Sequence, residues 1–69
     1  MEIKASMAGN VWKITVQQGE AVEAGQDIVI LESMKMEIPI ASEEKGILKE
    51  WKVQEGDFVD EGDTIAIVE

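Results

Sequence analysis

The sequence is written twice, and this internal repeat restricts the chain to folds with two similar halves. A shift of 37 positions places residues 9–32 over residues 46–69 without a gap, and nine of the 24 aligned pairs are identical. The six glycines form three of these pairs, Gly9/Gly46, Gly19/Gly56 and Gly25/Gly62. Because glycine tolerates tight and left-handed backbone, the matched glycines predict that both halves bend at the same places. Two similar halves in turn predict a pseudo-two-fold axis.

Each half has a pattern of short strands separated by glycine-containing turns. The expected strands are Val11–Val16, Val22 and Ile28–Glu32 in the first half and Leu48–Val53, Phe58–Val59 and Ile65–Glu69 in the second, preceded by Ile3–Ala5 and Ile38–Ile40. Short strands with regularly spaced turns are typical of all-β sandwiches and barrels. No window shows a helical period of apolar residues. The sequence therefore predicts one all-β domain over residues 1–69.

The spacing of apolar residues predicts a bend in the first long strand of each half. Ile14 and Val16 are two positions apart and share a face, whereas Val11 has the opposite parity, and the second half repeats this arrangement. A β-bulge would bring all three side chains inward. Trp12 aligns with a lysine in the second half, so we expect Trp12 to be partly exposed and Trp51 to be better buried.

A lysine between two methionines lies where the two halves join. Apolar runs at residues 28–31 and 38–40 flank this junction, so we expect two strands with a turn at Ser33–Lys35 between them. The pseudo-two-fold axis would place this turn opposite the two chain termini. Such a turn would hold Lys35 out in solvent at one end of the domain.

Composition excludes several classes of function. The chain has no cysteine and no histidine, which removes the preferred zinc ligands and the commonest general base near neutral pH. The acids of the turns lack the ligand spacing of a calcium loop, so no metal site is expected. A net charge of −9 argues against nucleic-acid binding or an anionic membrane surface. No apolar run approaches the roughly 20 residues that span a bilayer, and the absence of cysteine fits a reducing, cytoplasmic location.

The junction resembles the attachment motif of biotinyl domains, in which a central Met-Lys-Met carries biotin on the lysine. The residues that carry the resemblance are Glu32, Ser33, Met34, Lys35, Met36 and Glu37. The glycine turns also fall where biotinyl and lipoyl domains have theirs, so the resemblance covers nearly the whole chain. It points to the short, free-standing biotin/lipoyl attachment proteins and to the carboxyl carrier domain of biotin-dependent carboxylases.

The resemblance implies a barrel-sandwich hybrid, a flattened barrel of two four-stranded antiparallel sheets, with Lys35 on a tight hairpin turn. It implies that a biotin–protein ligase recognises Met34 and Met36 and joins biotin to Lys35 as an amide. Glu32, Ser33 and Glu37 would flank the motif. The attached biotin would carry a carboxyl group between a biotin carboxylase and a carboxyltransferase component. The domain itself would hold no catalytic residue and would be monomeric.

Two departures from the family pattern and two rival functions remain. Ser33 stands where many biotinyl domains have alanine, but it is small and compatible with a turn. The gap-free repeat also leaves no room for the inserted thumb of some bacterial carrier subunits. A lipoyl carrier of an acyl-transfer complex is the first rival, although lipoyl domains more often place aspartate before the lysine and alanine after it. The second is an unmodified interaction module, which has no reason to keep a lysine between two methionines. An enzyme in its own right is the least supported interpretation.

Overall fold

A computed structural model describes all residues 1–69 and contains eight strands and no helix. The strands are β1 (Glu2–Lys4), β2 (Gly9–Ile14), β3 (Ala21–Val22), β4 (Asp27–Ser33), β5 (Met36–Ala41), β6 (Gly46–Trp51), β7 (Phe58–Val59) and β8 (Thr64–Val68). With no helix present, none is long and apolar enough to cross a membrane.

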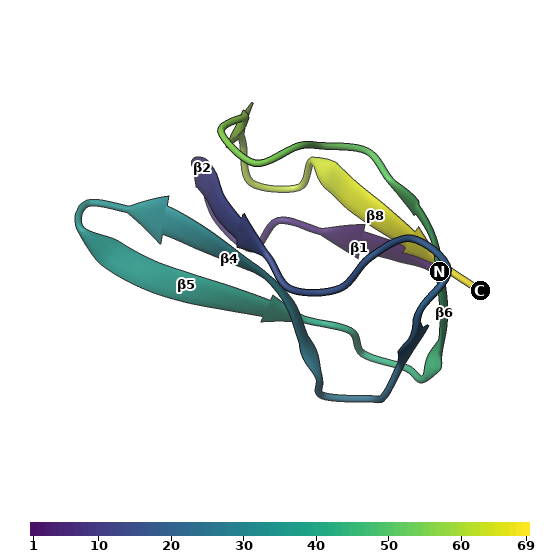
Figure 1. The fold of residues 1–69 in the computed structure, drawn as a ribbon. Helices are drawn as coiled ribbons and strands as arrows, with labels where there is room; N and C mark the ends of the chain where they lie inside the picture. The colour runs from purple at the N-terminus through teal and green to yellow at the C-terminus, as the bar shows by residue number, and fades with distance from the viewer.

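The strands form two four-stranded antiparallel sheets, as predicted. One sheet has the strand order β1-β8-β6-β3 and the other has the order β5-β4-β2-β7. Replacing each strand by its counterpart in the other half converts one order into the other, which confirms the pseudo-two-fold arrangement. Each sheet contains two strands from each half, and Figure 1 shows the sheets facing each other, with the β4–β5 hairpin extending to the left.

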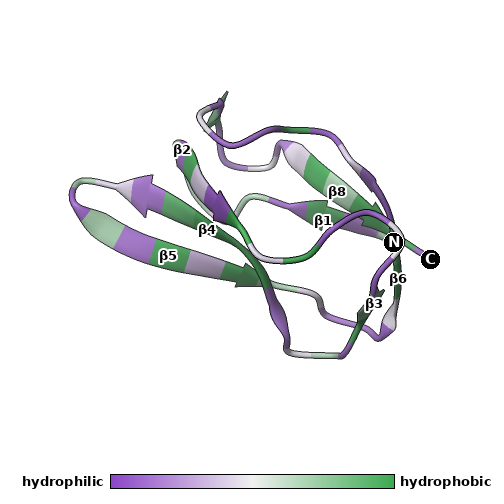
Figure 2. Cartoon of the chain, in the orientation of Figure 1, coloured by the Kyte–Doolittle hydropathy of each residue, from purple (hydrophilic) through white to green (hydrophobic).

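Fourteen buried apolar residues form a single core between the sheets. Figure 2 shows hydrophobic and hydrophilic residues alternating along β5, as expected for a strand with one face toward the core and one toward solvent. Val29 and Leu31 of β4 are fully buried at 0% exposure, as are Leu48 and Ile65 from the other sheet. Both sheets therefore contribute fully enclosed side chains, and the core holds the two halves together.

The predicted bend is present in both halves. The pairing of β2 with β4 shifts between Val11 and Lys13, and the pairing of β6 with β8 shifts at the equivalent place. The bulge lets Val11 be buried although its parity differs from that of Ile14. Trp12 is 50% exposed, and Trp51 is partly buried and donates its indole N–H to the Val16 carbonyl at 2.9 Å. Both tryptophan predictions are confirmed.

Four glycines adopt the left-handed conformation that the turns require. Gly19, Gly25, Gly56 and Gly62 have φ between 83° and 97°. Each is the third residue of a four-residue turn closed by a backbone hydrogen bond of 3.0–3.1 Å from the fourth residue to the first, the geometry of a type II turn. In each turn the side chain of the fourth residue also accepts a hydrogen bond from the first N–H. Three of these acceptors are acids, Glu20, Asp57 and Asp63, and the fourth is Gln26, so the repeated acids of the turns have a structural role.

The remaining glycine pair, Gly9 and Gly46, has a different role from the one predicted. Gly9 and Gly46 do not bend the chain but begin strands β2 and β6. A Cβ atom on Gly9 would lie 2.8 Å from the Glu32 carbonyl oxygen, and one on Gly46 would lie 2.6 Å from the Glu69 carbonyl oxygen. These contacts are shorter than atoms tolerate, so only glycine lets the neighbouring strands approach this closely.

Strands β2 and β6 are displaced by two residues from their predicted bounds, Val11–Val16 and Leu48–Val53. Strands β2 and β6 begin two residues earlier than predicted, at the glycines, and end two residues earlier, at Ile14 and Trp51. Val16 is buried at 3% exposure although it follows the end of β2. An apolar side chain can enter the core from a loop, so its burial does not establish strand structure.

We predict that Gly19→Ala lowers the free energy of unfolding by about 1 kcal/mol or more, because alanine is strained at positive φ. A Cβ atom at this position meets nothing within 4 Å, so the loss would reflect the backbone alone. Gln18→Ala, at the preceding exposed position, is the matched control and should change stability by less than about 0.5 kcal/mol. Denaturant titration of the two variants measures both values. Equal stabilities would mean that φ at Gly19 is not a constraint.

Candidate functional site

The two halves are joined by a two-residue turn at the tip of the β4–β5 hairpin. Ser33 and Met36 are directly paired across the two strands, so only Met34 and Lys35 form the loop. Their φ values are 52° and 65°. Positive φ at both central residues is the signature of a type I′ turn, whose twist matches that of the flanking strands. The predicted turn at Ser33–Lys35 is therefore present, with its centre at Met34 and Lys35.

The side chains of this turn do not suit its backbone. Type I′ turns favour asparagine, aspartate and glycine, whereas Met34 and Lys35 each carry a Cβ that crowds the backbone at positive φ. Left-handed conformation costs such a residue about 1–2 kcal/mol. Met34 and Lys35 are the only non-glycine residues with positive φ in the structure. Strain of this kind concentrates at functional sites, so the turn is the first candidate for a site.

The tip of the hairpin is exposed to solvent. Met34 is 88% exposed and Met36 is 55% exposed, and Lys35 between them is also exposed. Exposed apolar side chains of this size are unfavourable in a free protein and are typical of surfaces that a partner covers. Figure 1 shows the tip at the end of the molecule opposite the two chain termini, as the repeat predicted.

The amine of Lys35 makes no hydrogen bond or ion pair in the structure. By contrast, Lys49 pairs with Glu69 at 2.9 Å and Lys52 pairs with Glu50 at 3.3 Å. The hydrogen bond from Lys49 to Glu69, together with the charge of that carboxylate, raises the pKa of Lys49 above its usual value. Lys35 is thus a free amine, and its place in a strained turn distinguishes it from the other unpaired lysines.

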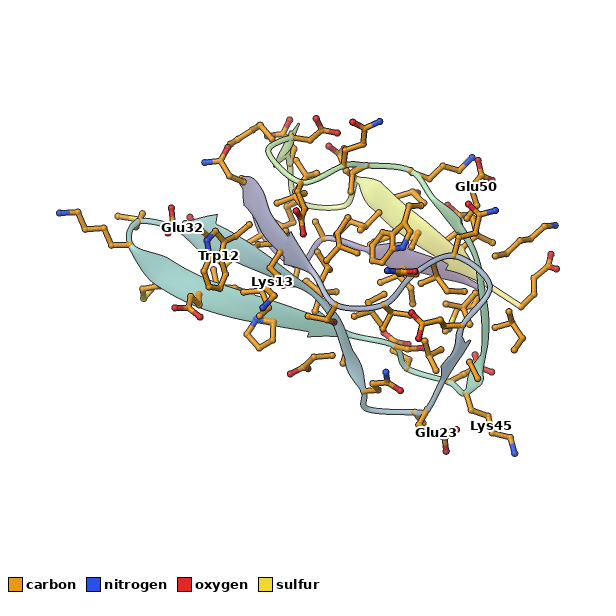
Figure 3. The ribbon with its side chains drawn as sticks, in the orientation of Figure 1. Trp12, Lys13, Glu23, Glu32, Lys45 and Glu50 are labelled. Atoms are coloured by element: carbon orange, nitrogen blue, oxygen red, sulfur yellow. The ribbon has the colours of Figure 1, made fainter.

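Two carboxylates face each other beside the tip. Glu32 and Glu37 are directly opposite in the pairing of β4 with β5, and both are exposed. Like charges in directly opposite positions destabilise a sheet, so this pair does not contribute to folding. Figure 3 shows Glu32 near the tip end of the molecule, with Lys45 and Glu23 at the far end. The two acids give the tip end of the hairpin a negative surface suited to a basic partner.

All six residues of the predicted motif lie together in this hairpin. Ser33 is partly buried, and a Cβ on Gly9 would lie 3.4 Å from the Ser33 Cβ. A small residue at position 33 therefore fits against β2, which explains why serine is tolerated there. The one cavity of the structure, of 330 Å³, is lined by residues 2–4, 6, 39–41 and 43 and includes none of the motif. The motif is a projecting tip and not a pocket.

The sequence did not indicate that Phe58 and Trp12 lie on the same sheet as the tip. Asn10 of β2 is paired with both Glu32 of β4 and Phe58 of β7, so these three side chains lie in one row. Phe58 is 62% exposed and Trp12 is 50% exposed, and both lie on strands of the sheet that holds the hairpin. The repeat could have indicated that these two aromatic residues are exposed, because each aligns with a small or charged residue in the other half.

Comparisons with known proteins show the family to which the chain belongs. The sequence profile of the family described as "Biotin-requiring enzyme", of biotin/lipoyl attachment domains, matches residues 1–69. The chain is 55% identical over 65 residues to the biotin/lipoyl attachment protein of Bacillus subtilis, covering 94% of this chain and 89% of that protein. It is 36% identical over 67 residues to the biotinylated protein TB7.3 homolog of Mycobacterium leprae, covering 97% of this chain and 94% of that protein.

A solved structure shows the same fold. The urea carboxylase of Kluyveromyces lactis contains a segment that superposes with a TM-score of 0.93 at 29% identity, covering 99% of this chain and 6% of the enzyme. The chain belongs to the biotin/lipoyl attachment family. It is a small attachment domain that acts as a carrier with partner enzymes and is not itself catalytic. Membership of the family implies a covalently bound biotin or lipoate.

We predict that Met34→Asn raises the free energy of unfolding by about 1 kcal/mol, because asparagine tolerates the left-handed conformation that methionine resists. Met36→Asn is the matched control, since Met36 is also exposed but lies in β5 without positive φ. The control should not be stabilised. Thermal or denaturant unfolding of the two variants gives the comparison, and a Met34→Asn protein no more stable than the parent would mean that the turn is unstrained.

Proposed function

We propose that Lys35 is the attachment residue and that it carries biotin, joined as an amide by a biotin–protein ligase. The domain then serves a biotin-dependent carboxylase or decarboxylase by moving between its biotin carboxylase and carboxyltransferase components. The observation that carries this proposal is the free, exposed Lys35 amine at the centre of a strained two-residue turn. The same turn carries the Met-Lys-Met sequence.

The attachment reaction needs an accessible amine more than a prepared active site. The Nζ atom of Lys35 attacks the activated carbonyl of the acyl donor, an amide bond forms, and the leaving group departs while the amine loses its proton. The Lys35 amine has no hydrogen-bond or ion-pair partner that could serve as a base, so in this proposal the ligase supplies the base and the activated donor. Lysine has a flexible four-carbon stem, which extends the reach of the group it carries.

The neighbours of Lys35 suit recognition by a ligase. Met34 and Met36 present exposed apolar side chains, and methionine adapts readily to the shape of a partner surface. The directly opposed Glu32 and Glu37 favour a basic ligase surface through charge complementarity. Ser33 keeps the hairpin close to β2 and does not need to touch the ligase. In this proposal the tip carries the recognition and the rest of the chain positions it.

The body of the domain suits movement between active sites. It measures 31 × 19 × 18 Å, with the tip at one end (Figure 1). Bound biotin supplies a ureido ring that accepts a carboxyl group at one centre and releases it at another. The protein keeps that ring on an arm that projects from a narrow end, where an active-site cleft can receive it. Biotin carboxylase and carboxyltransferase components are the partners of this proposal, and the working form is a monomer in the cytoplasm.

Lipoate on the same lysine is the alternative. The B. subtilis relative is named for both groups, whereas the M. leprae relative is named as biotinylated. Met34 and Met36 on both sides of the lysine favour biotin in this chain. An unmodified interaction module is less well supported, because a strained lysine turn without a function would be replaced by asparagine and glycine at no loss of stability.

We predict that biotin is attached to Lys35 alone. Lys4, Lys13 and Lys45 also make no ion pair, so they test whether exposure by itself is sufficient. The apo-protein would be incubated with biotin–protein ligase, biotin and ATP, and peptides would then be mapped by mass spectrometry. The biotinylated peptide should contain Lys35, and Lys35→Arg should abolish labelling. Comparable label on Lys13 would contradict the assignment.

We also predict that the position of the amine within the turn matters more than its exposure. Met34→Lys with Lys35→Met moves the amine by one residue and keeps composition and charge. Both positions have positive φ and contribute nothing to the core, so unfolding should be unchanged. A displacement of reacting groups by about 1 Å can cost on the order of 100-fold in rate, so the variant should be biotinylated at least about 100-fold more slowly. Labelling at the parent rate would show that the ligase reads only an exposed lysine.

A further inference from the structure

The two halves of the chain are held together by strand pairing and by one very short connection. Four of the six strand pairings, β1 with β8, β2 with β7, β3 with β6 and β4 with β5, join a strand of the first half (β1–β4) to a strand of the second (β5–β8). Each half by itself keeps a single pairing, β2 with β4 or β6 with β8. A single strand pair is marginally stable at best, so each half needs the other to fold.

Nothing in these pairings requires the two halves to belong to the same molecule. The only covalent link between Ser33 and Met36, which are paired across the hairpin, is the turn of Met34 and Lys35. That turn holds two non-glycine residues at φ of 52° and 65°. Short hinge loops under strain favour domain swapping, because opening the loop relieves strain while the packed interfaces form again between two chains.

We propose that this chain has a second folded state, a dimer in which two copies exchange their second halves through an opened turn. In this state β4, residues 34–35 and β5 form one continuous extended segment from Asp27 to Ala41. The second half of each copy then packs on the first half of the other. In this state the partner of each half is therefore a second copy of this chain.

The exchange preserves the contacts that stabilise the monomer. All four pairings between the halves form again between chains, including the antiparallel pairing of β4 with β5. The hydrogen bond from the Trp51 indole to the Val16 carbonyl also joins the two halves and becomes an intermolecular bond. The close contact of Gly9 with Glu32 lies within one half and is unaffected. Only the turn changes, and Met34 and Lys35 leave the left-handed region.

Closure of the hairpin within one chain competes with exchange between two chains, and the balance depends on the protein concentration. A short linker holds its two ends at an effective concentration in the millimolar range, so exchange becomes measurable when the chain refolds at about 1 mM. Once formed, the dimer separates only by unfolding of both halves and therefore persists after dilution. The opened turn no longer projects Lys35 from a hairpin tip. If the proposed function holds, the dimer is consequently a poor ligase substrate.

The decisive comparison changes only the two turn residues, Met34 and Lys35. The parent chain and the double variant Met34→Asn/Lys35→Gly would be unfolded, refolded at concentrations from about 10 μM to about 1 mM, diluted equally and examined by size-exclusion chromatography with light scattering. Asn-Gly is the preferred type I′ sequence and relieves the strain in the monomer. The parent should show a persistent species of twice its 7.6 kDa mass, at least about fivefold more abundant than in the double variant. A parent that stays monomeric throughout, or equal dimer in both chains, would overturn the proposal.

Failure of the parent monomer to accept biotin would count against the proposed function and leave the exchange unaffected.

Discussion

The dependence of the structure on pairing between the two halves explains most of its other features. Because four of six pairings cross between the halves, neither half has a core of its own. The pairing also fixes geometry: the strand that ends the first half and the strand that begins the second must be neighbours, β4 and β5, in one sheet. Their connection is therefore a hairpin at one end, while the chain termini lie at the other (Figure 1). The projecting lysine is a consequence of this topology.

The turn is the place where local preference and the global fold disagree. Elsewhere four glycines occupy the left-handed positions of the turns, and β-branched residues fill much of β4 and β8, in agreement with their preferences. At the tip, methionine and lysine occupy positions that favour asparagine and glycine, and two carboxylates face each other beside them. Sequences violate local rules mainly at functional sites. The disagreement supports a functional tip without reference to any relative.

Much of the fold could be predicted because the repeat tests each inference twice. The bulge followed from the parity of Val11 in both halves, and the turns followed from paired glycines. The close approach at Gly9 could not be predicted, because glycine in a sequence does not distinguish positive φ from a nearby carbonyl oxygen. The starts of β2 and β6 were missed for the same reason, whereas their ends were missed because Val16 is buried from a loop.

The site was only partly accessible to sequence reasoning. The motif around Lys35 could be located, but the φ values of Met34 and Lys35 depend on how two strands twist and meet. The row formed by Asn10, Glu32 and Phe58 depends on strand register between distant segments. Residue types alone do not specify the register between distant strands, so only the structure could identify these neighbours of the tip.

The intact mass of the protein after competition between two purified ligases tests most directly whether Lys35 carries biotin. The apo-protein would be offered equal amounts of a biotin–protein ligase and a lipoate–protein ligase, each with its acid and ATP, and sampled over time. We expect one added mass per chain, that of biotin in amide linkage, and no modification of Lys35→Arg. Lipoylation at an equal or greater rate, or a protein that neither ligase modifies, would contradict it.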